Sequence, residues 1–278
     1  MTRPRLPGSA AALRLTANCS ILFPDLPLLD RPAAARAAGF DAVEFWWPFD
    51  LTVPDEAEVA GFTSAVLDAG VELTGLNLPA GDMPAGERGI LSDPSRSAEF
   101  RDGVAVAVAI GARLGVVGFN ALYGNRLDGV EPADQDALAT ENLAFAGEAV
   151  AAIGATLLIE PLSGVDRYPL RTAAQALAVV DRVREEHGVE SLRLLADLYH
   201  LATNGDDVDA VLDTSTDRVG HVQIADAPGR GEPGTGELPL QTWLEGLAGR
   251  GYAGLVGLEY RPVTADPFAW LHRVADRA

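Results

Sequence analysis

Short apolar segments alternate along the chain with longer segments of helical periodicity. Most of the short segments are apolar on both faces, which is typical of strands in a parallel sheet. Most of the longer segments are followed by glycine, the residue that favours the end of a helix. The pattern predicts strands at residues 13–18, 42–45, 71–77, 114–119, 155–160, 192–197, 219–224 and 254–259. It predicts helices at residues 31–38, 54–69, 95–110, 133–153, 172–187, 206–212, 240–248 and 266–275.

Strict alternation of eight strand and helix units predicts an α/β fold, a single (β/α)8 TIM barrel rather than a doubly wound sheet. No linker or low-complexity block interrupts residues 13–278, so we expect them to form one catalytic barrel domain. Residues 1–12 are expected to be a flexible N-terminal tail. The connection at residues 79–94 is rich in glycine and proline, and we expect it to be a mobile lid over the site.

Four consecutive predicted strands carry a polar residue at or near their ends. In a parallel barrel such residues converge on one cavity, so four in succession indicate a single site, although any one alone would more often be a helix cap or a solvated charge. Two glutamates, an aspartate and an amide oxygen form an oxygen-rich cage suited to a divalent metal, Mg²⁺ or Mn²⁺, more than to zinc. The four residues are Glu160, Asp197, Gln223 and Glu259.

Charge and composition exclude several classes of function. A formal charge of −19 opposes binding to a phosphate backbone, so we expect no nucleic-acid partner. The apolar stretches are shorter than a membrane span requires, and the first residues lack the apolar core of a secretory signal, so we expect no membrane partner. Cys19 is the only cysteine, which fits a reducing cytoplasm. The chain contains no lysine, which excludes Schiff-base chemistry. A small-molecule substrate is expected, and a homo-oligomer stays open.

Six dispersed sequence motifs, in order between about residues 15 and 262, together resemble the hydroxypyruvate isomerase family of the xylose-isomerase-like barrel superfamily. The motifs lie at residues 34–45 (AARAAGFDAVEF), 159–161 (IEP), 197–200 (DLYH), 221–226 (HVQIAD), 228–237 (PGRGEPGTGE) and 257–260 (GLEY).

The resemblance implies roles for individual residues. Glu160 and Glu259 would be the catalytic acid/base pair. The metal cage of the superfamily would be formed by Glu160, Asp197, Gln223 and Glu259, and His200 and Arg230 would face the substrate. The sequence departs from the family pattern at positions that shape the pocket, namely Ser163, Ala202, Thr203 and Gly231.

The expected activity is the interconversion of hydroxypyruvate and tartronate semialdehyde, or the same reaction on a closely related small hydroxy-oxo acid. Two carboxylates can move a proton between neighbouring carbons through an enediolate. A divalent metal, or His200 and Arg230 in its place, would stabilise the developing oxyanion. A bidentate guanidinium such as that of Arg230 would suit the substrate carboxylate. A sugar 3-epimerase, an inosose dehydratase and a non-catalytic carbohydrate-binding barrel remain alternatives. An endonuclease is disfavoured by the acidic charge and the scarcity of histidine.

Overall fold

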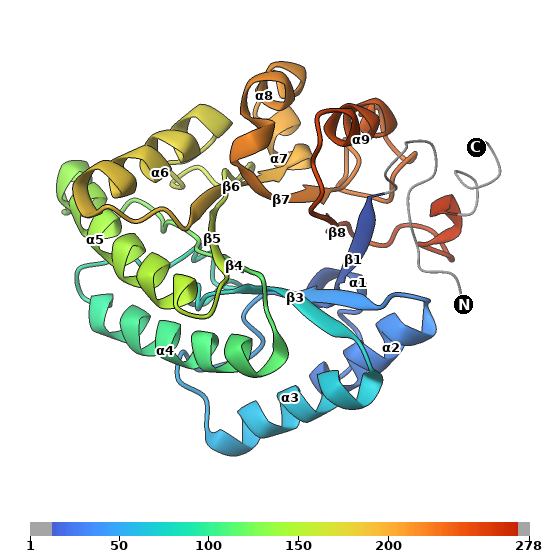
Figure 1. The fold of residues 1–278 in the computed structure, drawn as a ribbon, viewed down its shortest axis with the longest axis horizontal. Coiled ribbons are helices and arrows are strands. Elements are labelled where there is room, and N and C mark those ends of the chain that lie inside the picture. The colour runs from blue at the N-terminus through green and yellow to red at the C-terminus, as the bar shows by residue number, and fades with distance from the viewer. Residues whose placement is uncertain (1–12, 272–278) are drawn as a thin grey trace.

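The computed structural model describes residues 13–271, so the expected tail at residues 1–12 and the last seven residues lie outside the described part of the chain. The described residues form a closed barrel of eight parallel strands in sequence order, with the last strand paired to the first (Figure 1). This confirms the expected (β/α)8 fold. The strands are β1 (Arg14–Asn18), β2 (Ala42–Phe45), β3 (Glu72–Asn77), β4 (Gly118–Asn120), β5 (Thr156–Ile159), β6 (Leu192–Asp197), β7 (Val219–Ile224) and β8 (Leu255–Leu258).

Helices surround the barrel on its outer side (Figure 1). Several end as the sequence predicts, such as α3, which ends at Gly70 in the left-handed conformation. A capping box formed by Asp55 and Glu58 starts this helix two residues later than expected. The helices are α1 (Cys19–Leu22), α2 (Arg31–Ala37), α3 (Glu56–Ala69), α4 (Ser97–Leu114), α5 (Pro132–Ala151), α6 (Ala173–His187), α7 (Leu198–Thr203), α8 (Val208–Ser215) and α9 (Leu240–Gly249), with short 3₁₀ turns at η1 (Leu28–Asp30) and η2 (Thr216–Arg218).

The boundary between the fourth helix and the fourth strand was predicted wrongly. The expected helix ended before Gly111 and the expected strand began at residue 114, whereas α4 continues through Leu114 and β4 starts at Gly118. Gly111 does not end the helix; a Cβ atom there would lie 2.4 Å from Cζ of Phe119. Glycine at this position lets α4 pack closely against the barrel, and the helix ends instead at Gly115, whose φ is +76°.

Two short helices were not expected. Helix α1 follows β1 directly and α7 follows β6 directly, with Asn18 and Asp197 as their N-caps. Helix α8 spans Val208–Ser215 instead of residues 206–212. The last expected helix, at residues 266–275, lies partly outside the described residues. Over residues 13–271, no helix is both long enough and apolar enough to cross a membrane.

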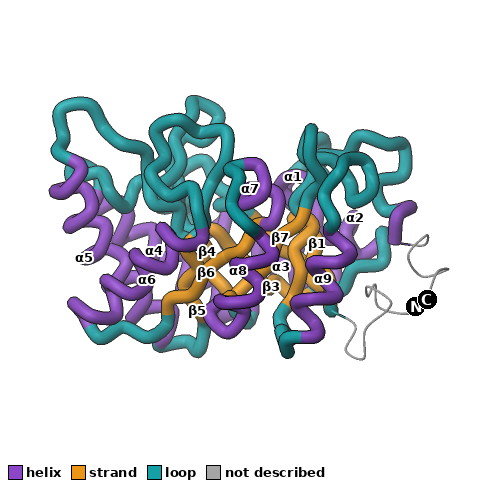
Figure 2. The backbone as a smooth tube through the Cα atoms, turned by 90° about the horizontal axis from the view of Figure 1, so that it is seen from above, coloured by secondary structure: helices purple, strands orange, loops and turns teal. Residues whose placement is uncertain are grey.

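The long strand-to-helix loops gather on one side of the barrel, the side on which α1 and α7 lie (Figure 2). The loop between β3 and α4, which contains the expected lid, is held by one backbone hydrogen bond within the loop and one to the loop after β4. Gly89 N donates to Ala80 O at 2.8 Å, and Gly124 N donates to Arg88 O at 2.9 Å. Opening of this loop over the cavity stays a prediction.

Candidate active site

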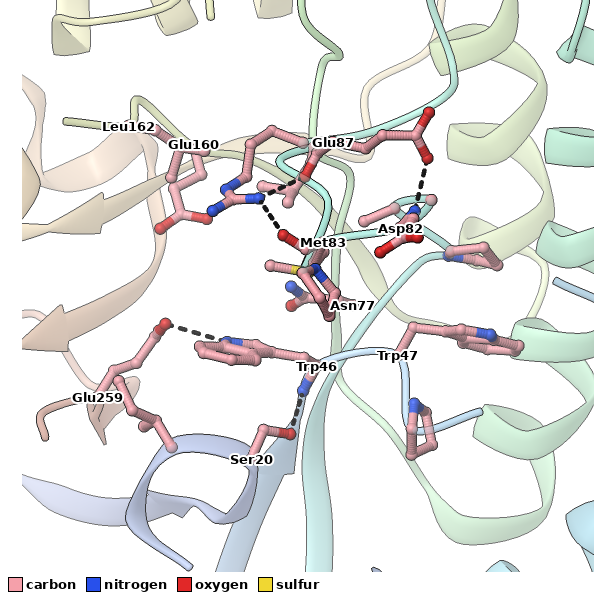
Figure 3. A pocket seen from close by; sticks show the side chains of 18 of the residues that line it. Ser20, Trp46, Trp47, Asn77, Asp82, Met83, Glu87, Glu160, Leu162 and Glu259 are labelled. Carbon is pink, nitrogen blue, oxygen red and sulfur yellow. Dashed lines mark hydrogen bonds between the residues drawn. The ribbon is translucent and has the colours of Figure 1, made fainter. Parts of the chain in front are cut away.

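A cavity of about 1560 Å³ opens at the carboxyl ends of the strands. Glu160 and Glu259, one residue beyond β5 and β8, both line it. Figure 3 shows the two side chains entering the cavity from separate strands, with Trp46 beside Glu259. His200 and Arg230 also line this cavity, so the structure brings four of the six expected site residues to one surface.

Glu160 is buried and has one hydrogen-bond donor among the described side chains. Its Oε2 accepts a hydrogen bond of 2.7 Å from Nδ2 of Asn120, at the end of β4. Burial, together with the negative charges of Glu259 and Asp197, raises the pKa of Glu160 well above its ordinary range. A carboxyl in this setting holds its proton more strongly than an exposed one and can act as a general acid.

Glu259 has two donors that favour its ionised form. Its Oε1 accepts from Arg230 Nη2 at 2.9 Å and from Trp46 Nε1 at 3.0 Å. Burial raises the pKa of Glu259 to about 8, although Arg230 and Trp46 oppose this rise. Glu259 thus has a guanidinium and an indole as donors, whereas Glu160 has the amide of Asn120, so the two carboxyls are suited to different roles.

Asp197 ends β6, and its two carboxylate oxygens have different partners. Its Oδ1 caps α7 by accepting from Tyr199 N at 2.9 Å and His200 N at 3.4 Å. Its Oδ2 faces Arg230 Nη2 at 3.4 Å and His200 Nε2 at 3.6 Å. The cap explains the position of His200, because it fixes the first turn of the helix that carries this residue.

The hydrogen bonds of His200 determine which ring nitrogen carries its proton. The backbone N–H of Ser163 donates to His200 Nδ1 at 3.0 Å, and the Ser163 hydroxyl lies 2.7 Å from the same atom. A nitrogen that accepts from an N–H carries no hydrogen, so the neutral ring is protonated on Nε2. Burial lowers the pKa of His200 to about 4, so at neutral pH the ring is uncharged and offers an Nε2–H donor.

Arg230 lies in the loop after β7, which is ordered around a buried carboxylate. Asp226 accepts hydrogen bonds from the backbone of Ala227, Gly234 and Leu238 at 2.9, 2.8 and 3.0 Å. Arg230 itself has a φ of +58°, an unfavourable conformation for a residue other than glycine. Its guanidinium lies 5.4 Å from the centre of the Tyr199 ring. Such strain is typical of a residue whose position is set by function.

Gln223 is buried in β7 and is oriented by Glu44 of β2. Its Nε2 donates to Glu44 Oε1 at 2.7 Å, and His221 Nε2 lies 2.7 Å from Glu44 Oε2. Glycine is required at position 257 of β8, because a Cβ atom there would lie 2.6 Å from Glu44 Oε1. The amide oxygen of Gln223 is buried and accepts no hydrogen bond from the described residues. It is therefore the end of the amide that is free to bind an ion or a substrate.

The carboxylates and the free amide oxygen fit a divalent cation by their donor chemistry. Ligand atoms of Glu160, Asp197 and His200 lie within 4.8 Å of one another, and this cluster could hold a metal ion. His200 is the weakest ligand of the three, because Nδ1 accepts from Ser163 and Nε2 carries the proton. Arg230 already donates to Asp197 and Glu259, so a metal ion would share these carboxylates with a guanidinium.

Sequence reasoning missed the polar residues on the first half of the barrel. Asn18 and Asn120 are the last residues of their strands, and Glu44 is the last but one. All three are buried and contact site residues or one another. The signal that revealed the later four residues, a polar residue at the end of a strand, was also present here.

Comparison with known proteins agrees with this geometry. A family model described as xylose isomerase-like TIM barrel matches residues 32–274. A putative hydroxypyruvate isomerase of Streptomyces coelicolor is 53% identical, over 93% of this chain and 95% of that protein. The hydroxypyruvate isomerase of Escherichia coli is 37% identical, over 91% and 95% of the two chains. The 2-oxo-tetronate isomerase of Cupriavidus necator is 37% identical, over 93% and 97%.

A solved structure is also similar. The crystal structure of an AP endonuclease, family 2, from Brucella melitensis superimposes with a TM-score of 0.84 at 30% identity, over 94% of this chain and 98% of that one.

Proposed function

The chain belongs to the xylose isomerase-like TIM barrel family, and from this premise we propose that it is an isomerase of a small hydroxy-oxo acid, interconverting hydroxypyruvate and tartronate semialdehyde. The observation that carries the proposal is the buried pair Glu160 and Glu259 in one cavity, with different hydrogen-bond donors on each carboxyl. The names of the relatives support the substrate class.

In the proposed mechanism the two carboxyls exchange protons with neighbouring carbons. Ionised Glu259 removes a proton from the hydroxymethyl carbon of hydroxypyruvate, and the electron pair forms an enediolate. Protonated Glu160 then delivers a proton to the former carbonyl carbon, and a proton moves between the two enediolate oxygens to give tartronate semialdehyde. The roles of the carboxyls reverse in the opposite direction. The chain has no lysine, so carboxylates are the natural bases.

His200 and Arg230 are proposed to face the substrate oxygens. The Nε2–H of His200 can donate to the oxygen on which negative charge develops, and because the ring is neutral it does so without losing its own proton. Arg230 donates to both Asp197 and Glu259, and this orients Glu259, the proposed base. The positive charge of Arg230 stays in the cavity.

A divalent metal, Mg²⁺ or Mn²⁺, is proposed to be held by Glu160, Asp197, Gln223 and Glu259. When bound, it would add positive charge beside the enediolate oxygens. We also propose a cytoplasmic location, because a single cysteine, Cys19, can form no disulfide within the chain.

A four-carbon substrate is the second candidate. The cavity of about 1560 Å³ is larger than a three-carbon acid requires, and one relative is named a 2-oxo-tetronate isomerase. Both acids can undergo the same proton transfer next to a ketone, so the residues would keep their roles.

The test is an assay of the purified protein with each acid. Hydroxypyruvate is supplied together with a tartronate semialdehyde reductase and NADH, and absorbance at the NADH band is followed; 2-oxo-tetronate is followed by proton NMR. Glu259→Gln is the matched control, because it removes one of the two carboxyls that the proposed mechanism requires. We expect turnover of at least one acid by the natural chain and none by the variant. Turnover of a neutral ketose with neither acid converted would replace this proposal by the sugar epimerase.

A further inference from the structure

The catalytic cavity has an excess of negative charge. Glu160, Asp197 and Glu259 are buried there, and Arg230 is the cation among them. Arg230 and a divalent metal ion held by the same residues would together only balance the three carboxylates. A substrate carboxylate is therefore bound better by a further cation that is not paired with these residues.

Arg230 is poorly suited to be that cation. Its Nη2 is shared between Glu259 at 2.9 Å and Asp197 at 3.4 Å, and its Nε donates to Glu259 O at 3.3 Å. A substrate carboxylate at this guanidinium would lie beside two carboxylates of the protein. The repulsion would offset much of what the hydrogen bonds contribute.

Three further arginines that line the cavity are also unsuited. Arg96 is paired with Glu87 and Glu99 at 2.9 and 2.7 Å. Arg31 donates from Nε to Leu26 O at 2.9 Å and from Nη2 to Pro24 O at 3.2 Å, so the two donors that would bind a carboxylate side by side are already used. Arg261 is exposed at the rim of the cavity.

Arg88, in the loop between β3 and α4, combines features that none of these other arginines has together. Its Nη1 donates to the backbone carbonyls of Met83 at 2.9 Å and Glu87 at 2.6 Å, and within residues 13–271 it forms no ion pair with a carboxylate. It lines the cavity and is close enough to His200 to affect the pKa of the ring. Met83 and Glu87, whose backbone carbonyls accept from this guanidinium, line the same cavity as Glu160 (Figure 3).

We propose that Arg88 binds the carboxylate of the substrate and so selects oxo acids over neutral sugars; this rests on the proposed function. Its Nε and Nη2 donate to no atom of the described residues, so they are available to the two oxygens of a carboxylate.

The loop holds Arg88 in place before the substrate arrives. The carbonyl of Arg88 accepts from Gly124 N at 2.9 Å, and the next residue, Gly89, donates to Ala80 O at 2.8 Å. Gly89 has a φ of +105°, and a Cβ atom there would lie 1.9 Å from Leu122 O, so another residue would shift the loop. A cation fixed in this way loses little conformational entropy when it binds an anion.

The test compares Arg88→Gln with Arg261→Gln, which removes the same charge from the rim of the same cavity. Steady-state kinetics are measured with hydroxypyruvate and with dihydroxyacetone, its neutral analogue. Calorimetric titration with glycerate, which keeps the carboxylate but cannot isomerise, measures binding without turnover. We expect Arg88→Gln to raise KM for hydroxypyruvate and Kd for glycerate at least about tenfold, the size of a charge-assisted hydrogen bond. Dihydroxyacetone kinetics and the Arg261→Gln protein should change less than about twofold.

The two failures can be told apart. If the natural chain turns over neither hydroxypyruvate nor 2-oxo-tetronate, the proposed function is wrong, and the glycerate titration still decides the role of Arg88. If Arg88→Gln binds glycerate as tightly as the natural chain, or loses hydroxypyruvate and dihydroxyacetone equally, the inference is overturned. Should Arg88→Gln not fold, Arg88→Lys keeps a donor for the two backbone carbonyls, and it should show a smaller rise in the same two constants.

Discussion

The indole Nε1 of Trp46 donates a hydrogen bond of 3.0 Å to Oε1 of Glu259, joining the end of β2 to the end of β8 at the cavity (Figure 3). This bond favours the ionised carboxylate, and it opposes the effect of burial on the pKa of Glu259. Trp46 thus positions Glu259, the proposed base, although the two residues are 213 positions apart in the sequence.

Trp46→Phe should raise the pKa of Glu259 above its value of about 8 in the natural protein. The variant keeps an aromatic ring but loses the donor, so the pH at which kcat/KM reaches half its plateau should increase by about one unit. The control is Trp47→Phe, because the Trp47 indole donates to Leu51 O instead. Identical pH profiles for Trp46→Phe and the natural protein would show that this bond does not tune the base.

Glu160→Gln and Glu259→Gln should each reduce kcat by about 10²–10⁴, because each removes a proton-transfer group with little change in volume. Circular dichroism should show that both variants keep the fold of the natural protein. Activity within a few-fold of the natural enzyme would remove that residue from the mechanism.

Glu160→Gln should also make the protein more stable at alkaline pH. A carboxyl whose pKa is higher in the folded state stabilises the fold fully below its unfolded pKa, and this contribution is lost as the pH rises through the folded pKa. The natural chain should therefore lose stability when the pH is raised from about 5 to about 8, and the variant should lose less.

Urea unfolding at both pH values measures this difference. Glu141→Gln on the exposed face of α5 is the control and should lose stability as the natural chain does. An equal loss in Glu160→Gln would mean that burial does not perturb Glu160.

Mn²⁺ should bind where the buried carboxylates meet. Crystals grown with Mn²⁺ should show anomalous density at Glu160, Asp197, Gln223 and Glu259, with Arg230 moved away from Asp197. Calorimetry should show that Asp197→Ala loses this binding, whereas Asp226→Asn, in the loop after β7, should retain it. Density at another cluster would restrict these four residues to proton transfer and hydrogen bonding.

The barrel could be predicted from the sequence because its determinants are local. Short segments apolar on both faces mark strands, and glycine or a capping box marks the ends of helices such as α3. The prediction was wrong at Gly111, where glycine serves close packing against Phe119 across the fold. A packing requirement of this kind leaves no trace in the local pattern.

The site could be predicted only in part, for the same reason. Polar strand ends pointed to Glu160 and Glu259, since the barrel brings such ends together. The orientation of Gln223 depends on Glu44, 179 positions away. Arg88 lies in a loop, where no periodicity distinguishes it from the other arginines, and only the pairing of Arg230 with two carboxylates draws attention to it.

The most direct test of the central claim, carboxylate-mediated proton transfer on a small oxo acid, is NMR of ¹³C-labelled hydroxypyruvate with the natural protein in D₂O. We expect tartronate semialdehyde to appear, with deuterium at the carbon that was the ketone, and we expect neither product nor exchange with Glu160→Gln or Glu259→Gln. Unchanged hydroxypyruvate with no deuterium incorporated, at a protein concentration comparable to that of the substrate, would contradict the account.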